Sequence, residues 1–177
     1  MRKTNISLIG FRATGKSTVG RILAEEIEWP FVDMDERLAS SFGRDIRDWV
    51  LNHGWESFRE AESHLLETLA NRKAIVVATG GGVILDAANR NVLKERFFNV
   101  WLNTSPEILF ERLARDPKTH SDRPALTSLS LRDEIAITLR ERRPYYEETA
   151  DLVMDSGTST ASELALSIVK RIKGTII

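Results

Sequence analysis

Short apolar runs alternate with stretches of helical periodicity along the whole chain. Five of the apolar runs have the length of buried strands, at residues 6–9, 31–32, 74–78, 98–102 and 152–154. This alternation of strand and helix is typical of a parallel sheet with helices on both faces. The pattern therefore predicts an α/β fold, a three-layer sandwich around a five-stranded parallel sheet.

The helices follow from apolar residues that repeat at helical spacing between these strands. They are expected at residues 16–27, 36–42, 45–51, 55–69, 87–96, 106–114, 131–146 and 161–173. The stretch between the second and third strands is longer than an ordinary crossover. Because ligands of open α/β sheets bind at the carboxyl ends of the strands, we expect an insertion at about residues 33–62 that binds a second ligand.

A phosphate-binding motif joins the first strand to the first helix. Gly10 to Ser17 match the pattern G-x-x-x-x-G-K-[ST], in which backbone N–H groups wrap a phosphate, the lysine reaches the β- and γ-oxygens and the hydroxyl binds Mg²⁺. The alternative is a structural glycine turn. We assign nucleotide binding to the loop and the start of the helix, namely Gly10, Ala13, Thr14, Gly15, Lys16, Ser17 and Thr18. This motif indicates a P-loop nucleotide-binding fold, which leaves several classes of protein open.

Several classes of nucleotide-binding protein do not fit the rest of the chain. Neither N-K-x-D nor D-x-x-G occurs, which argues against a GTPase. The third strand ends in Thr79 and three glycines rather than in the Asp-Glu pair usual for large ATPases. A compact kinase that acts on a small molecule remains.

Glycines and carboxylates follow two of the strands. Gly80, Gly81 and Gly82 form either a tight turn or a place where the backbone approaches a ligand closely. Asp33 and Asp35 are two residues apart, which on an extended segment places both carboxylates on one face, suited to a hydrated metal and a substrate hydroxyl. Alternatively, one of them caps the following helix.

Arginines suggest where an acidic substrate binds. Glu62 falls inside the apolar stripe of helix 55–69, one turn from Arg59, and can hold the guanidinium toward a ligand carboxylate; a surface ion pair is the alternative. Arg140, Arg142 and Arg143 form a second group, or simply a solvated helix face. Together with the carboxylates and glycines, these arginines suggest that the phosphoryl acceptor is a small polyhydroxylated carboxylic acid.

Composition narrows the partners and the compartment. A net charge of −1 gives no field that would attract nucleic acid or an anionic membrane, so neither partner is expected. The absence of cysteine excludes disulfides and a thiol nucleophile, and no apolar run suits a signal peptide or a membrane span. We expect one cytoplasmic kinase domain over residues 1–177, acting as a monomer.

The motifs taken together resemble the shikimate kinase family over essentially the whole chain. The similarity lies in GFRATGKST, FVDMDE, SFREAE, TGGGV, SDRPAL and RRPYY, in that order. The resemblance implies a P-loop fold of the nucleoside monophosphate kinase type. It also implies transfer of a phosphoryl group from ATP to shikimate with Mg²⁺. Other small kinases, for gluconate or a nucleoside monophosphate, and a nucleotide-dependent binding module are the alternatives.

The resemblance also implies roles for individual residues. Catalysis would fall to Lys16, Asp35 and Arg123, the last on a lid at about residues 115–130. Mg²⁺ would be held by Ser17 with the help of Asp33, and adenine would lie against Arg115 and residues 155–159. Shikimate would be bound by Asp35, Arg59, Gly80, Gly81, Gly82 and Arg142, with Glu62 orienting Arg59.

Overall fold

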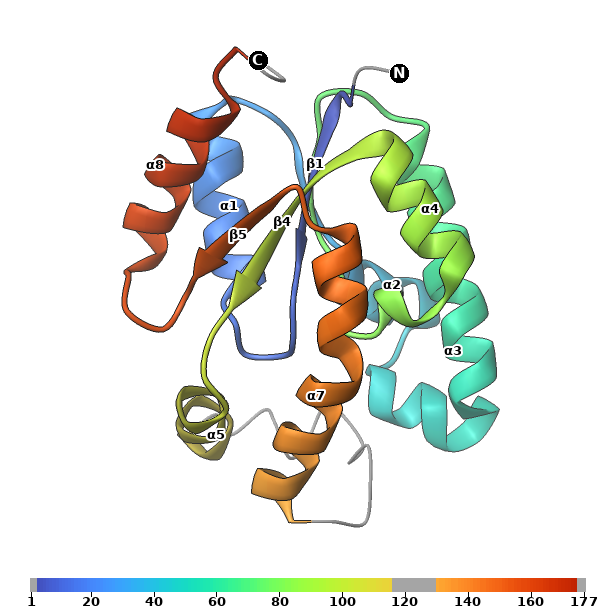
Figure 1. Ribbon diagram of the computed structural model, residues 1–177. Helices are drawn as coiled ribbons and strands as arrows, with labels where there is room; N and C mark the ends of the chain where they lie inside the picture. The colour runs from blue at the N-terminus through green and yellow to red at the C-terminus, as the bar shows by residue number, and fades with distance from the viewer. Residues whose placement is uncertain (1–2, 116–129, 175–177) are drawn as a thin grey trace.

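The sheet has five strands that all run in the same direction. A computed structural model describes residues 3–115 and 130–174 of the chain (Figure 1). The strands are β1 (Asn5–Ile9), β2 (Phe31–Asp33), β3 (Val76–Ala78), β4 (Phe97–Asn103) and β5 (Leu152–Asp155), in the order β2-β3-β1-β4-β5. Every neighbouring pair is parallel, which confirms the predicted five-stranded parallel sheet.

Helices cover both faces of this sheet. On one face lie α1 (Lys16–Glu26) and α8 (Ala161–Ile172), side by side at the left of Figure 1. On the other face lie α3 (Ile46–Ala70), α4 (Ala87–Arg96) and α7 (Leu131–Thr149). The remaining helices are α2 (Met34–Phe42), the short η1 (Val83–Leu85) and α5 (Pro106–Arg115).

The core follows from the alternation of side chains along the central strand β1, which is buried throughout. Ile6 and Leu8 pack with α1 and α8, whereas Ile9 packs on the opposite face with side chains of α3, α4 and α7. Successive side chains of a strand point to opposite faces, so one apolar run supplies both cores. Thus β1 is buried up to the point where its carboxyl end enters the phosphate-binding motif.

Several boundaries differ from the predicted ones by a few residues. Helix α2 begins at Met34, because Asp33 caps it by accepting from two backbone N–H groups. The predicted helices 45–51 and 55–69 are both present within α3 and are separated at Gly54, whose φ of 82° interrupts the helical path. Strand β3 begins after Ala74, whose φ is 56°. Helix α7 ends at Thr149, three residues beyond the predicted end at residue 146.

The carboxyl ends of the strands meet at the lower edge of the sheet in Figure 1, at the end of the molecule opposite both termini. The strand order reverses at β1, since the chain passes first to β2 and β3 on one side and then to β4 and β5 on the other. Ligands bind at such a reversal in open α/β sheets. In the two described ranges, no helix is long and apolar enough to cross a membrane.

Candidate active site

The phosphate-binding motif forms a loop that needs its unusual backbone conformations. Gly10, Ala13 and Gly15 all have positive φ, of 144°, 62° and 91°. A Cβ on Gly10 would lie 2.5 Å from the Leu102 carbonyl oxygen, so only glycine fits where the loop leaves β1. Ala13 adopts the left-handed region without being glycine, and such strain is concentrated at functional loops. The loop therefore follows a backbone path that ordinary residues would not adopt at these positions.

The loop delivers a lysine and a helix terminus to the same place. Lys16 Nζ donates to the carbonyl oxygens of Gly10 at 2.9 Å and Phe11 at 2.7 Å, so its ammonium lies over the loop. Within the described residues, no side chain caps the amino terminus of α1. Its first N–H groups and its dipole then favour an anion, as a phosphate requires.

Asp33 and Asp35 lie in different surroundings. Asp33 Oδ1 accepts from the N–H groups of Asp35 at 3.0 Å and Glu36 at 3.2 Å, and its Oδ2 accepts from the Ser17 hydroxyl. Asp33 therefore is a helix cap and also faces the phosphate loop. Because α2 begins at Met34, the expectation of two carboxylates on one extended face is wrong: Asp35 turns instead into a separate pocket.

That pocket lies beside the phosphate loop and is open to solvent. Its walls come from the phosphate loop, α2, α3, α7 and the glycines that follow β3. Its polar groups belong to Arg12, Asp35, Arg59, Glu62, Gly81 and Arg142. Residues far apart in the sequence thus converge at one binding site.

Arg59 is held in the pocket by a buried carboxylate. Glu62 is fully buried and pairs with Arg59, whose side chain keeps 31% of its surface exposed. Burial raises the pKa of Glu62, and Arg59 opposes that rise. The Arg59 guanidinium also lies over the rings of Trp55 and Phe58. A surface ion pair is excluded, because one partner has no contact with solvent.

Two of the three glycines, Gly80 and Gly82, are required by close approach to these side chains. A Cβ added to Gly80 would come within 3.0 Å of Glu62 Oε1, and one added to Gly82 would come equally close to the Arg59 guanidinium. Neither glycine has positive φ, so space and not backbone conformation demands glycine here. The loop after β3 therefore lies directly on the Arg59–Glu62 pair.

Only one of the three late arginines enters the pocket. Arg142 lines it and donates from Nη1 to the Gly81 carbonyl at 2.9 Å, and burial lowers its pKa from the usual arginine value. Arg143 pairs with Glu147 on the exposed face of α7, and Arg140 is exposed as well. The solvated-face interpretation holds for these two, whereas Arg142 lies on the side of the pocket that faces Gly81.

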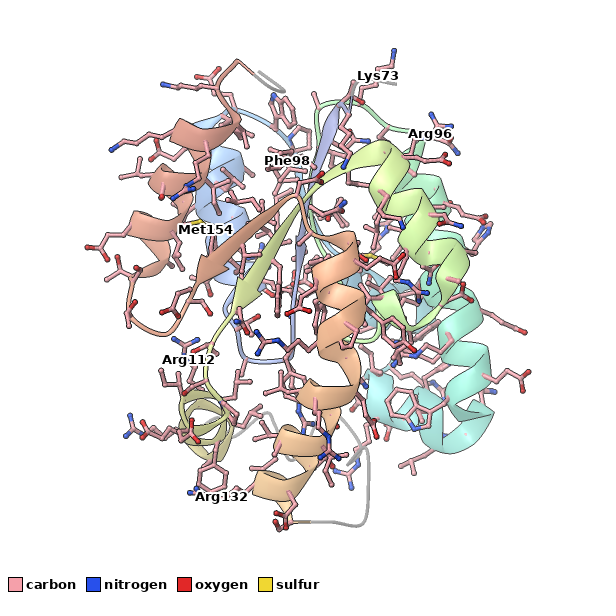
Figure 2. All side chains as sticks on the ribbon, viewed as in Figure 1. Lys73, Arg96, Phe98, Arg112, Arg132 and Met154 are labelled. Carbon is pink, nitrogen blue, oxygen red and sulfur yellow. The ribbon has the colours of Figure 1, made fainter. Side chains whose placement is uncertain are left out.

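Other functional contacts were not evident from the sequence. Arg112 donates to the carbonyl oxygens of Ala13 at 3.1 Å and Ser156 at 2.6 Å, so it ties the phosphate loop to the segment after β5; Figure 2 labels it on α5. Arg12 pairs with the buried Glu134 of α7. Helical periodicity gave no signal for either, because each partner is distant in sequence.

The structure does not test the predicted nucleotide roles of two residues. The Arg115 side chain is 83% exposed and lies 3.9 Å from the Glu111 carboxylate. Its role at adenine stays a prediction. Arg123 and most of the predicted lid at 115–130 lie outside the described residues.

The phosphate loop follows the central strand, and a pocket lined by carboxylates and arginines lies beside it. This arrangement defines a P-loop kinase of small molecules. A sequence profile of the family "Shikimate kinase" matches residues 12–173. The chain therefore belongs to the shikimate kinase family, as its motifs predicted.

Individual relatives agree with this placement. The chain is 46% identical over 145 residues to a shikimate kinase of Nitratidesulfovibrio vulgaris, covering 82% of each chain. Its structure resembles that of shikimate kinase from Acinetobacter baumannii in complex with shikimate, with a TM-score of 0.90, 35% identity and coverage of 97% of this chain and 94% of the other. The shikimate kinase of Aquifex aeolicus gives a TM-score of 0.81 at 32% identity, with 96% of each chain covered.

Proposed function

We propose that this chain transfers the γ-phosphoryl group of ATP to the 3-hydroxyl of shikimate, giving shikimate 3-phosphate and ADP. The observation that carries the proposal is the convergence of Asp35, Arg59 and Arg142 in one pocket beside the phosphate loop. A carboxylate for a hydroxyl and two guanidinium groups for an acid match an acceptor that has both groups. Residues 1–177 would act as one kinase domain and as a monomer, with the insertion at about 33–62 on the acceptor side.

The nucleotide would bind at the loop between β1 and α1. Its phosphates would be wrapped by Gly10, Ala13, Thr14, Gly15 and Thr18, with the Lys16 ammonium turning from the loop carbonyls to the transferred group. Ser17 and Asp33 place two oxygen atoms side by side, which suits a hard cation, so these residues would hold Mg²⁺. When bound, Mg²⁺ supplies positive charge that offsets the charge on the phosphate oxygens.

The acceptor would lie between α2, α3 and α7. Its carboxylate would face the Arg59 and Arg142 guanidinium groups, while Gly80, Gly81 and Gly82 would let the backbone approach its ring. Asp35 would orient the 3-hydroxyl and accept its proton late in the reaction, as the new P–O bond forms and the bond to ADP breaks. Positioning and charge stabilisation, and not covalent catalysis, would supply most of the rate.

We further propose that Arg123 neutralises the transferring group from the lid and that Arg115 contacts the adenine with residues 155–159. The family resemblance supports both roles, and the Arg112 contact to Ser156 supports a nucleotide boundary at that segment.

A panel of acceptors tests this function. ADP release from Mg·ATP is measured with shikimate, gluconate and nucleoside monophosphates, and we expect that shikimate alone stimulates it. Equal stimulation by gluconate would reject the acceptor assignment. Release that no acceptor stimulates would indicate a nucleotide-dependent binding module.

Arg59→Lys tests the acid-binding side of the pocket. The variant keeps a positive charge but loses the planar fork, so shikimate affinity should fall by about 1–3 kcal/mol, the contribution of a charge-assisted hydrogen bond. ATP affinity should change little. Calorimetry with each ligand measures both, and Arg143→Lys, on the exposed face of α7, is the matched control. Unchanged shikimate affinity would place the carboxylate elsewhere.

A further inference from the structure

The carbonyl oxygen of Gly81 receives two hydrogen bonds from one helix. Tyr146 Oη donates to it at 2.6 Å, and Arg142 Nη1 donates at 2.9 Å. The two donors are four residues apart on α7 and therefore lie on the same helix face. A carbonyl oxygen has two lone pairs, so this pair of donors saturates it.

Tyr146 is built to be a fixed donor. Its side chain is buried in the core between the sheet and α7, and its ring stacks on Trp101 with centroids 5.6 Å apart. Burial raises the pKa of Tyr146 to about 12, so the hydroxyl keeps its proton at any working pH. Because the Gly81 carbonyl can only accept, the hydroxyl must be the donor in this contact.

The contact also constrains the peptide that joins Gly81 to Gly82. No peptide bond in the described ranges is cis, so the N–H of Gly82 points opposite to the Gly81 carbonyl, away from α7. No hydrogen bond joins this N–H to another described residue. Both glycines line the acceptor pocket. Because glycine backbone is conformationally permissive, its orientation depends on the hydrogen bonds that fix it.

We propose that Tyr146 is a positioning residue for the acceptor, which fixes the Gly81–Gly82 peptide so that its N–H serves as a donor in the pocket. The proposal rests on the proposed function, since it gives that acceptor site a further determinant. The Tyr146 hydroxyl binds the Gly81 carbonyl from outside the pocket. Arg142 uses one N–H group for the same carbonyl and keeps other N–H groups that can bind a ligand carboxylate. One hydroxyl outside the pocket thus sets both the glycine loop and the environment of Arg142.

Tyr146→Phe removes this hydroxyl and keeps the stacked ring. Tyr145→Phe is the matched control, because Tyr145 is the adjacent residue, is 36% exposed and lies against Arg90 instead of the pocket. Steady-state kinetics give KM for shikimate and for ATP, calorimetry gives shikimate affinity without turnover, and thermal unfolding reports folding. We expect Tyr146→Phe to raise KM and Kd for shikimate about three- to tenfold, the effect of one net hydrogen bond, and to change KM for ATP less than twofold.

The outcomes separate this proposal from the proposed function. If the parent chain shows no shikimate-stimulated ADP release, the proposed function fails, whatever the variants do. If the parent is active and Tyr146→Phe binds shikimate as Tyr145→Phe does, the positioning role alone is overturned. A rise in both KM values together with a lower unfolding temperature would also overturn it, since Tyr146 would then only support the fold.

Discussion

Lys16→Ala should lower kcat by about 10²-fold or more while the chain remains folded. A donor aimed at charge that develops in the transition state is typically worth that much. The Lys16 ammonium lies over the phosphate loop, and its side chain belongs to none of the hydrophobic clusters, so its loss removes charge stabilisation and not core packing. Steady-state ADP release measures the effect, with circular dichroism to follow folding.

Lys94→Ala is the control for this substitution. Lys94 pairs with Glu148 at 2.7 Å on the surface between α4 and α7, far in sequence from the phosphate loop. Its removal should leave kcat unchanged. A folded Lys16→Ala variant with kcat within twofold of the parent would show that the loop takes no part in catalysis.

Asp35→Asn should have the second large effect. Asparagine keeps the size of the side chain but loses the charge that accepts a proton, and a positioned acid–base group contributes about 10²–10⁴-fold. Because Asp33 and not Asp35 caps α2, the substitution leaves the helix start intact. We expect kcat to fall about 10²-fold or more with little change in KM for ATP.

Asp86→Asn is the matched control, since Asp86 caps α4 by accepting from the Ala88 N–H at 2.6 Å. Asparagine caps a helix about as well as aspartate, so stability and turnover should both be retained. If Asp35→Asn retained the turnover of Asp86→Asn, the hydroxyl would have to be oriented by another group.

The fold was largely predictable because local patterns specify it. Apolar runs identified all five strands, and the helices between them followed from residues spaced by one turn. The errors lie where a single residue overrides the pattern. The left-handed backbone of Ala74 delays β3, and the Asp33 cap starts α2 earlier than its apolar residues indicate. The predicted helix 131–146 already included Pro144, and the structure continues it to Thr149.

The site was predictable where function imposes a motif. Lys16, Ser17 and the three glycines belong to strings whose spacing carries chemistry, and Glu62 was conspicuous as a carboxylate in an apolar stripe. Neither Tyr146 nor Arg112 was indicated by a motif or by an unusual position in a helical pattern. A tyrosine in an amphipathic helix is ordinarily a core residue, and only the folded chain brings its hydroxyl to Gly81. Contacts between distant segments depend on how α7 packs against the sheet and α5 against α7, which periodicity does not specify.

The most direct test of the central claim is the identity of the product. The parent chain is incubated with Mg·ATP and shikimate, and the product is analysed by mass spectrometry and by phosphorus and proton NMR. The account predicts one phosphomonoester, formed in equal amount with ADP, whose phosphorus is coupled to the proton at carbon 3 of the ring. ADP formed with inorganic phosphate, or a phosphoryl group on another hydroxyl, would contradict it.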